Sequence, residues 1–193
     1  VNQLINLYNQ GQFLETVKKA NLILENNPGA FMVWDVLGAA NKELNRIGES
    51  ANSFKKVTEL NPTYANGFNN LGIVLQELGK LEDAIKAYNK AITVRPDFAE
   101  AYYNMGNALK NQKKLEEAVK VYKKTLSLMP ENANVLFNLG SAFQEQGKLE
   151  LAINAYNRAL LIEPNYVDAY YNMGNALKDR GKLEDAINAY NKA

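Results

Sequence analysis

The prolines of this 193-residue chain recur with a fixed period. All five prolines are spaced 34 residues apart, at Pro28, Pro62, Pro96, Pro130 and Pro164. Five glycines have the same spacing, at Gly38, Gly72, Gly106, Gly140 and Gly174. A longer phrase also repeats, because residues 168–178 copy residues 100–110 except at the first position. Repetition at this length is typical of a stacked solenoid, in which each unit buries its apolar face only against its neighbours.

Two stretches with helical apolar spacing lie within each period. In the first full repeat, Leu37 belongs to one stretch, and Ile47, Phe54 and Val57 belong to the next. The pattern predicts an all-α fold made of 34-residue helix–turn–helix units. We expect a degenerate half-repeat that caps the array at residues 1–30, and an array at residues 31–193 with repeats at 31–64, 65–98, 99–132 and 133–166 and a partial repeat at 167–193.

The residues between the helices predict how the turns are built. Gly79, Gly147 and Gly181 follow the first helix of their repeats, where a left-handed residue closes a helix end without a Cβ penalty. Lys113 occupies the same place in another repeat and is poorly suited to it, which predicts a looser turn there. Asn165 resembles the start of a helical capping box.

The mid-helix glycines predict close contact between helices, because glycine costs about 1 kcal/mol against alanine within a helix. Large residues recur on the second helix of each pair, and we expect them to bridge to the next unit with any hydroxyl group at a wet rim. These residues are Phe54, Tyr88, Tyr122, Tyr156 and Tyr190. At helical spacing they are core residues rather than a cofactor site.

Composition excludes several classes of function. The net charge of +1 offers no field for nucleic acid, and no apolar run approaches the roughly 18 residues of a membrane span. The chain has no cysteine and no histidine, which removes thiolate chemistry, the commonest general base and the commonest metal ligand. We therefore expect no catalytic residue, no metal and no cofactor, and a cytoplasmic protein.

The second helices also carry a small residue at each period, as Ser50, Ala84, Ala118, Ala152 and Ala186. Taken together, the leucine–glycine pair, these small positions, the aromatic positions and the proline resemble the tetratricopeptide repeat. The resemblance covers nearly the whole chain. It implies a right-handed superhelix whose first helices line a concave face. Proteins of this kind are mostly scaffolds that bind a peptide or a helix of another protein.

An asparagine ladder is the strongest candidate for ligand contact. Asn70, Asn104, Asn138 and Asn172 recur at the 34-residue step, and an amide offers both the donor and the acceptor that a peptide backbone needs. Similar ladders occur in peroxisomal import receptors and O-linked GlcNAc transferases. The residues expected on the concave face are Asn66, Asn69 and Asn70; Glu100, Tyr103, Asn104 and Asn107; Asn134, Phe137, Asn138 and Ser141; and Asp168, Tyr171, Asn172 and Asn175.

Several alternatives remain open at the level of sequence. The asparagines would serve only packing if each bonded to its neighbours. The chain starts at Val1 without a methionine and stops within a helical pattern, which fits a regulatory or substrate-docking arm of a larger enzyme of the glycosyltransferase or sulfotransferase type. Self-association through solenoid ends is a third possibility. A carboxylate clamp is disfavoured, since the lysines of the expected face lie only near helix ends.

Overall fold

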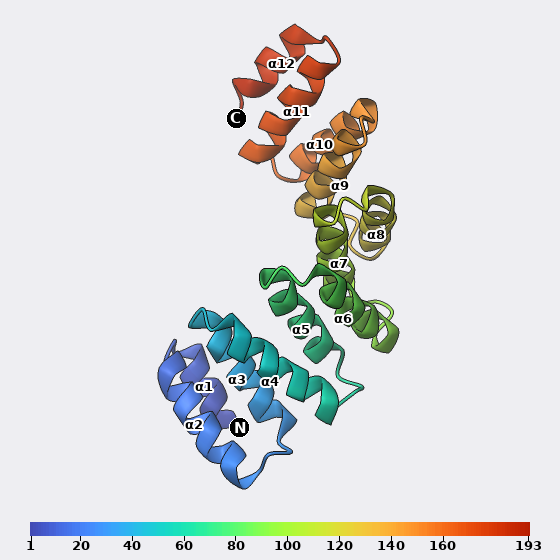
Figure 1. Cartoon of the computed structure of the whole chain (residues 1–193). Coiled ribbons are helices and arrows are strands. Elements are labelled where there is room, and N and C mark those ends of the chain that lie inside the picture. The colour runs from blue at the N-terminus through green and yellow to red at the C-terminus, as the bar shows by residue number, and fades with distance from the viewer. The chain divides into compact units, whose positions relative to one another are not determined.

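The computed structural model describes residues 1–193 and contains twelve α-helices and no strand (Figure 1). The all-α fold predicted from the sequence is confirmed. The helices are α1 (Asn2–Asn9), α2 (Phe13–Asn26), α3 (Phe31–Glu43), α4 (Ile47–Leu60), α5 (Ala65–Glu77), α6 (Leu81–Val94), α7 (Ala99–Asn111), α8 (Leu115–Leu128), α9 (Ala133–Glu145), α10 (Leu149–Ile162), α11 (Val167–Asp179) and α12 (Leu183–Tyr190). None of them combines the length and the apolarity that crossing a membrane requires.

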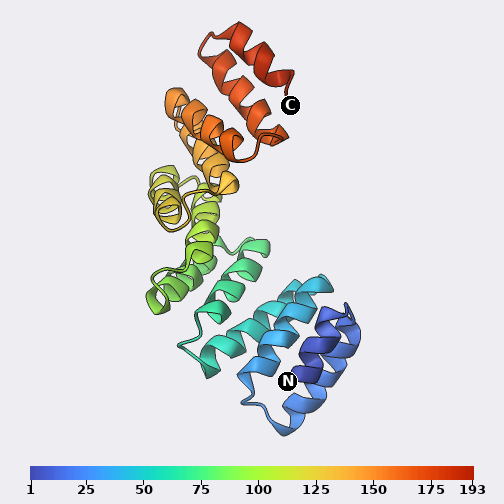
Figure 2. The same ribbon diagram turned by 180° about the vertical axis from the view of Figure 1, so that it is seen from behind.

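The chain divides into two compact units, Val1–Ala101 and Tyr102–Ala193, and the boundary falls within α7. In the first unit α2 packs on α3, α3 on α4, α4 on α5 and α5 on α6. In the second unit the packing runs from α8 to α12 in the same consecutive order. Figure 2 shows the same helices from behind. Because each helix contacts mainly its neighbours in sequence, each unit has the one-dimensional packing of a solenoid.

The turn after each first helix contains one residue in the left-handed region. Gly79, Gly147 and Gly181 have φ angles of 72°, 73° and 76°, which confirms the predicted turns. Lys113 has a φ of 60°, and its turn is not looser. Its N–H donates to the Lys110 carbonyl at 2.9 Å and the next N–H closes the turn at 3.0 Å, as in the Gly79 turn. The prediction of a looser turn is wrong, because the lysine accepts the backbone conformation that the hydrogen bonds require.

An aromatic ring packs on the mid-helix glycine within each full repeat. A Cβ added to Gly72 would lie 2.5 Å from Cε1 of Tyr88, and one added to Gly106 would lie 2.6 Å from Cε1 of Tyr122. The glycine that each ring contacts belongs to the same repeat, and Phe54 also shares a buried cluster with Val74 of the next repeat, as the predicted bridge requires. The predicted wet rim is wrong, since both tyrosine rings are buried and the Tyr122 hydroxyl donates to Asn107 Oδ1 at 2.7 Å.

Side-chain caps play little part in starting the helices. Asn132 caps α9 by accepting a hydrogen bond from the Val135 N–H at 3.0 Å. Helix α11 instead begins after Tyr166, which makes no side-chain cap. The capping box expected from Asn165 is therefore wrong, because the helix starts one residue later than that pattern requires.

Candidate functional site

The asparagine ladder lies on the first helix of successive pairs. Asn70 is on α5, Asn104 on α7, Asn138 on α9 and Asn172 on α11, and all four are partly buried. Within each of the two units, we call the side of the first helices that carries these asparagines the first-helix face.

In the first unit the ladder amide is linked to a carboxylate on the preceding first helix. Asn70 Nδ2 donates to Asp35 Oδ1 at 3.5 Å, and the Tyr64 hydroxyl donates to Asp35 Oδ2 at 3.3 Å. Burial raises the pKa of the Asp35 carboxyl above its ordinary value, and the two hydrogen bonds oppose that shift. Asp35 thus joins α3 to α5 at an electrostatic cost.

A hollow of about 240 Å³ opens beside this pair. The residues that line it come from α1, α3, α4 and α5 and are Tyr8, Ala39, Lys42, Glu43, Phe54, Asn70 and Ile73. The Tyr8 hydroxyl donates to Glu43 Oε1 at 3.5 Å. The hollow is smaller than a typical site for a drug-sized ligand, so it has room for one side chain of a longer ligand.

The other predicted residues of the first unit differ in accessibility. Asn69 is 2% exposed and its Nδ2 donates to Glu100 Oε1 at 3.4 Å, so this amide lies beneath the surface. Asn66 is exposed and its Oδ1 accepts a hydrogen bond from Arg95. Of these residues, Asn66 and Glu100 can be reached from solvent.

In the second unit Asn138 is the centre of a polar network between α7 and α9. Its Nδ2 donates to the Tyr103 hydroxyl at 3.0 Å and to the Asn134 carbonyl at 3.1 Å. Its Oδ1 accepts from Lys110 Nζ at 3.0 Å, and the same ammonium group lies 3.5 Å from Ser141 Oγ. Burial lowers the pKa of Lys110. Both amide hydrogens of Asn138 are therefore used inside the protein.

The aromatic residues of the second unit continue the face. The Phe137 ring lies 5.0 Å from the Tyr166 ring, measured between centroids, and the Tyr166 hydroxyl donates to Asn134 Oδ1 at 2.9 Å. Tyr171 on α11 differs from Phe137, because it is 56% exposed and lies over Tyr190 with the ring centroids 5.9 Å apart. The exposed face of Tyr171 is available to a ligand.

Two further asparagines use only their carbonyl oxygens. Asn107 Oδ1 accepts from the Tyr122 hydroxyl at 2.7 Å, and Asn175 Oδ1 accepts from the Tyr190 hydroxyl at 2.8 Å. Each bond fixes the hydroxyl group of a core tyrosine, and the Nδ2 hydrogens of the asparagine are not used in it. On α11 the Asn175 amide lies on the helix that also carries the exposed carboxylate of Asp168.

These side chains can hold a ligand by hydrogen bonds and apolar contact. No group of three acidic residues comes together in a way that could bind a metal ion. Sequence reasoning missed Asp35, Tyr64 and Tyr166, although each bonds to a predicted residue or its neighbour. The 34-residue step carried a signal for Asp35, since it precedes Asn69 by one period.

Solved structures with a similar fold cover most of the chain. A crystal structure of MamA is 24% identical over 81% of this chain and 91% of its own length, with a TM-score of 0.77. MamA residues 41 to the end from Desulfovibrio magneticus RS-1 are 20% identical over 84% of this chain and 92% of that one, with a TM-score of 0.80. YrrB, described as a TPR protein with an unusual peptide-binding site, is 18% identical over 90% and 89%, with a TM-score of 0.75. These likenesses establish the fold.

Comparison with curated protein sequences gives no significant match. Family models give several. Models described as TPR repeat match residues 75–113, 106–147 and 140–179, and models described as tetratricopeptide repeat match residues 33–64, 53–86 and 167–193. Since these matches run without a gap from residue 33 to residue 193, and the first model alone accounts for more than half of the chain, this protein belongs to the tetratricopeptide repeat family.

Proposed function

We propose that the chain is a protein-interaction scaffold whose first-helix face binds an extended peptide segment of a partner protein. The observation that carries this proposal is the exposed ring of Tyr171, which is 56% accessible on the helix that also presents Asn172 and Asn175. Membership of the tetratricopeptide repeat family supports it, and so does the peptide-binding site ascribed to YrrB, a protein of similar fold.

An extended peptide suits this face because its backbone needs partners for both N–H and C=O groups. An asparagine side chain supplies both kinds of partner from one amide. At a net contribution of about 1 kcal/mol for each hydrogen bond, a few amides alone give only weak binding. Micromolar affinity therefore requires apolar contact, which the exposed ring of Tyr171 offers in the second unit.

The rungs of the ladder are not equivalent in this proposal. Asn138 spends both amide hydrogens on Tyr103 and Asn134, so it mainly holds α7 against α9. Asn175 keeps its amide hydrogens after accepting from Tyr190. We assign the ligand contacts of the second unit chiefly to α11. Asn175 is a donor beside the Tyr171 ring, and Asn172, whose side chain is hydrogen-bonded to Tyr156, keeps one further amide hydrogen for a ligand.

The test is an array of unstructured peptides of varied sequence, followed by fluorescence anisotropy on the tightest binder. Tyr171→Ala combined with Asn172→Ala is expected to weaken binding by at least about tenfold, since a ring contact and a hydrogen bond are lost together. Helicity should not change, because Tyr171 is largely exposed.

Two control variants make the result specific. Leu161→Ala removes a side chain that is 82% exposed on α10, a second helix, and should leave the affinity unchanged. Asn104→Ala with Asn138→Ala separates ligand contact from packing, because loss of the Asn138 bonds should lower stability by about 1–3 kcal/mol. If the Tyr171/Asn172 variant bound the peptide with full affinity, the first-helix face of α11 would not be the binding surface.

A further inference from the structure

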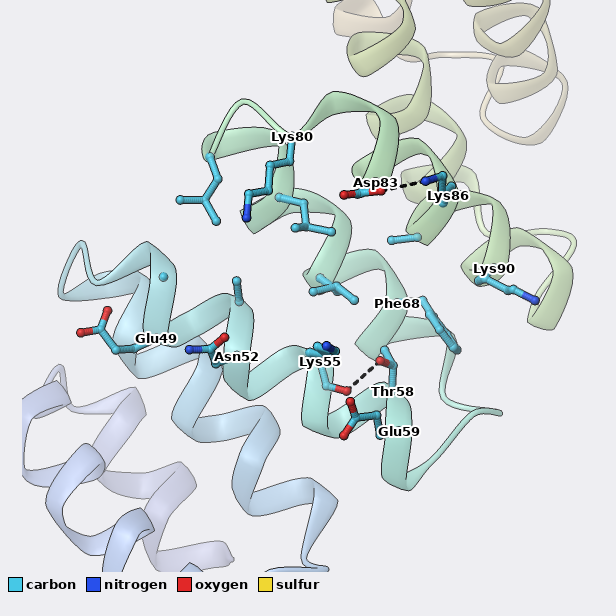
Figure 3. Close-up of a pocket in the computed structure, with 16 residues that line it drawn as sticks. Glu49, Asn52, Lys55, Thr58, Glu59, Phe68, Lys80, Asp83, Lys86 and Lys90 are labelled. Atoms are coloured by element: carbon cyan, nitrogen blue, oxygen red, sulfur yellow. Dashed lines mark hydrogen bonds and ion pairs between the residues drawn. The ribbon is translucent and has the colours of Figure 1, made fainter.

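A second groove lies in the first unit, on the side of α5 that is bounded by α4 and α6 (Figure 3). Its volume is about 1000 Å³, four times that of the hollow on the first-helix face. We call it the α4–α6 groove. All the residues that line it lie between Gly48 and Lys90, so it is complete within the first unit.

The floor of the α4–α6 groove is an apolar ridge along α5 and its C-cap residue, Leu78. Phe68, Leu71, Leu75 and Leu78 follow one another at spacings of three, four and three residues, which places them on one face of the helix. At 1.5 Å per residue the ridge is roughly 15 Å long, close to three helical turns. All four side chains retain access to solvent, and Leu78 is 40% exposed.

Two small residues on the α4 wall keep the groove open. Gly48 and Ala51 line it, and a Cβ added to Gly48 would meet no atom within 4 Å. The same places hold glutamate and valine or isoleucine on the second helices of the second unit, as Glu116 and Val119 on α8 show. The corresponding floor on α9 is closed, since Leu136, Leu139 and Phe143 are 0%, 4% and 6% exposed.

The charges around the groove are predominantly positive. Two of its acids are neutralised, because Glu59 pairs with Lys56 at 2.8 Å and Asp83 pairs with Lys86 at 2.9 Å. Three exposed lysines of the lining are in no ion pair, and they are Lys55, Lys80 and Lys90. Glu49 is the one lining acid left without an ion pair.

We propose that the α4–α6 groove binds an amphipathic helix of a partner protein whose apolar stripe is flanked by acidic residues. A helix satisfies its own backbone hydrogen bonds, so it needs from the groove only an apolar floor and a complementary charged rim. The rim offers ammonium groups and only one amide side chain, Asn52, which suits a helix better than an extended chain. The two faces therefore take ligands of different conformation.

A smaller groove in the second unit shows which features distinguish the first. It has a volume of about 310 Å³, and its lining residues lie three repeat lengths after their counterparts in the α4–α6 groove. Ile153 stands at the place of Ala51, Asn157 at the place of Lys55 and Asn188 at the place of Lys86. More of the space is filled and two positive charges are absent, so this site is the weaker competitor for the same ligand.

The probe is a synthetic helical peptide with leucines spaced as in the ridge and glutamates on both flanks. Its twin carries lysines at every glutamate position. We expect the glutamate peptide to bind the protein with a dissociation constant in the micromolar range, as measured by fluorescence anisotropy. The lysine twin should bind at least about tenfold more weakly, and added salt should weaken the glutamate peptide.

The decisive variant combines Gly48→Glu with Ala51→Ile. It fills the groove with side chains that the chain itself uses at Glu150 and Ile153. The gain in helix propensity from Gly48→Glu outweighs the smaller loss from Ala51→Ile. The fold should be retained, while the glutamate peptide loses at least about tenfold in affinity. Lys55→Ala with Lys90→Ala should weaken binding and flatten its salt dependence.

Three results would overturn the proposal: no binding of the glutamate peptide, equal binding of both peptides, or unchanged binding to the filled groove. Sedimentation of the protein alone supplies a fourth. Self-association that the Gly48/Ala51 variant abolishes would assign the groove to a second copy of the chain. The Tyr171/Asn172 variant should bind the glutamate peptide normally, so this test is independent of the first-helix face.

Discussion

Two glycines of the first unit have opposite surroundings at the scale of single residues. Gly72 is buried in α5, and an added Cβ would lie 2.5 Å from the ring of Tyr88, which is itself 1% exposed. Gly48 is exposed near the start of α4, and an added Cβ would meet nothing within 4 Å. Both are helical, so the preference of a helix for alanine over glycine acts on both.

Gly72→Ala is expected to lower the free energy of unfolding by about 1–3 kcal/mol, because the methyl group forces the buried ring to move. Gly48→Ala is the matched control and should raise that free energy by up to about 1 kcal/mol, since only helix propensity changes. Urea denaturation of the two variants measures both effects. Equal stabilisation by the two substitutions would show that the Tyr88 ring yields without cost.

Asp35 provides a test of electrostatics at the same scale. Burial raises its pKa, so its ionised form is less stable in the folded protein than in the unfolded chain. Asp35→Asn keeps an acceptor for Asn70 and removes the charge. It should therefore raise the free energy of unfolding at pH 7.

The gain from Asp35→Asn should depend on pH with a definite sign. The penalty on wild-type Asp35 is present above the raised folded pKa and vanishes as the pH falls below about 4, where the carboxyl is protonated in both states. Urea denaturation at pH 7 and near pH 3.5 measures the difference. A variant that is less stable than the wild type at pH 7 would mean that the bonds from Tyr64 and Asn70 outweigh the burial of the charge.

At the scale of the secondary-structure elements, the turn between α7 and α8 stores strain in one lysine. Lys113 has a φ of 60°. Its side chain is exposed, and its ammonium group lies 2.9 Å from the Glu145 carboxylate. Lys113→Gly is expected to raise the free energy of unfolding by about 0.5–1 kcal/mol, because glycine adopts this conformation without a Cβ clash. The ion pair is largely exposed and contributes little.

Lys113→Ala isolates the ion pair, since it removes the charge but keeps the backbone strain. We expect its stability to lie close to that of the wild type when both are unfolded in urea. A loss of stability in the glycine variant that the alanine variant shares would assign the effect to the contact with Glu145 rather than to the turn.

The helices and their turns were predictable from local signals, and the contacts between side chains were less so. Helical apolar spacing and a left-handed glycine such as Gly79 act within one or two turns of chain, and the structure has the helices and the turn where the pattern predicts. The bond from Asn138 to Tyr103 joins residues 35 positions apart on different helices. Periodicity predicts that such residues share a face, but it does not tell whether an amide points to a ligand or to its neighbour.

The α4–α6 groove was also missed, for a related reason. The groove depends on Gly48 and Ala51, which differ from the glutamate and the β-branched residue at the same positions in the second unit. A repeat pattern is recognised from the residues that its copies share, so such differences do not contribute to it. The structure shows that the floor residues of the groove keep access to solvent, and the small residues on α4 leave that access open. In a repeat protein, the site-specific information lies in the positions that break the period.

At the scale of the whole molecule, consecutive packing predicts that stability is local. The helix contacts join mainly neighbours in sequence, as in a one-dimensional array whose stability is a sum of repeat and interface terms. In such arrays, a destabilising substitution in one repeat also lowers the stability of the adjacent repeats, and the effect decreases with distance along the chain. Two buried glycines, one in each unit, allow the idea to be tested symmetrically.

Gly72→Ala should increase amide hydrogen exchange in α3 to α6 and leave α10 to α12 close to the wild type. Gly174→Ala, in which the new Cβ would lie 2.5 Å from Cε1 of Tyr190, should do the reverse. Each 1.4 kcal/mol lost should accelerate the affected amides about tenfold, because exchange follows the free energy of local opening. Acceleration of every helix by the same factor in both variants would show that the chain unfolds as one cooperative body, and the local account would then fail.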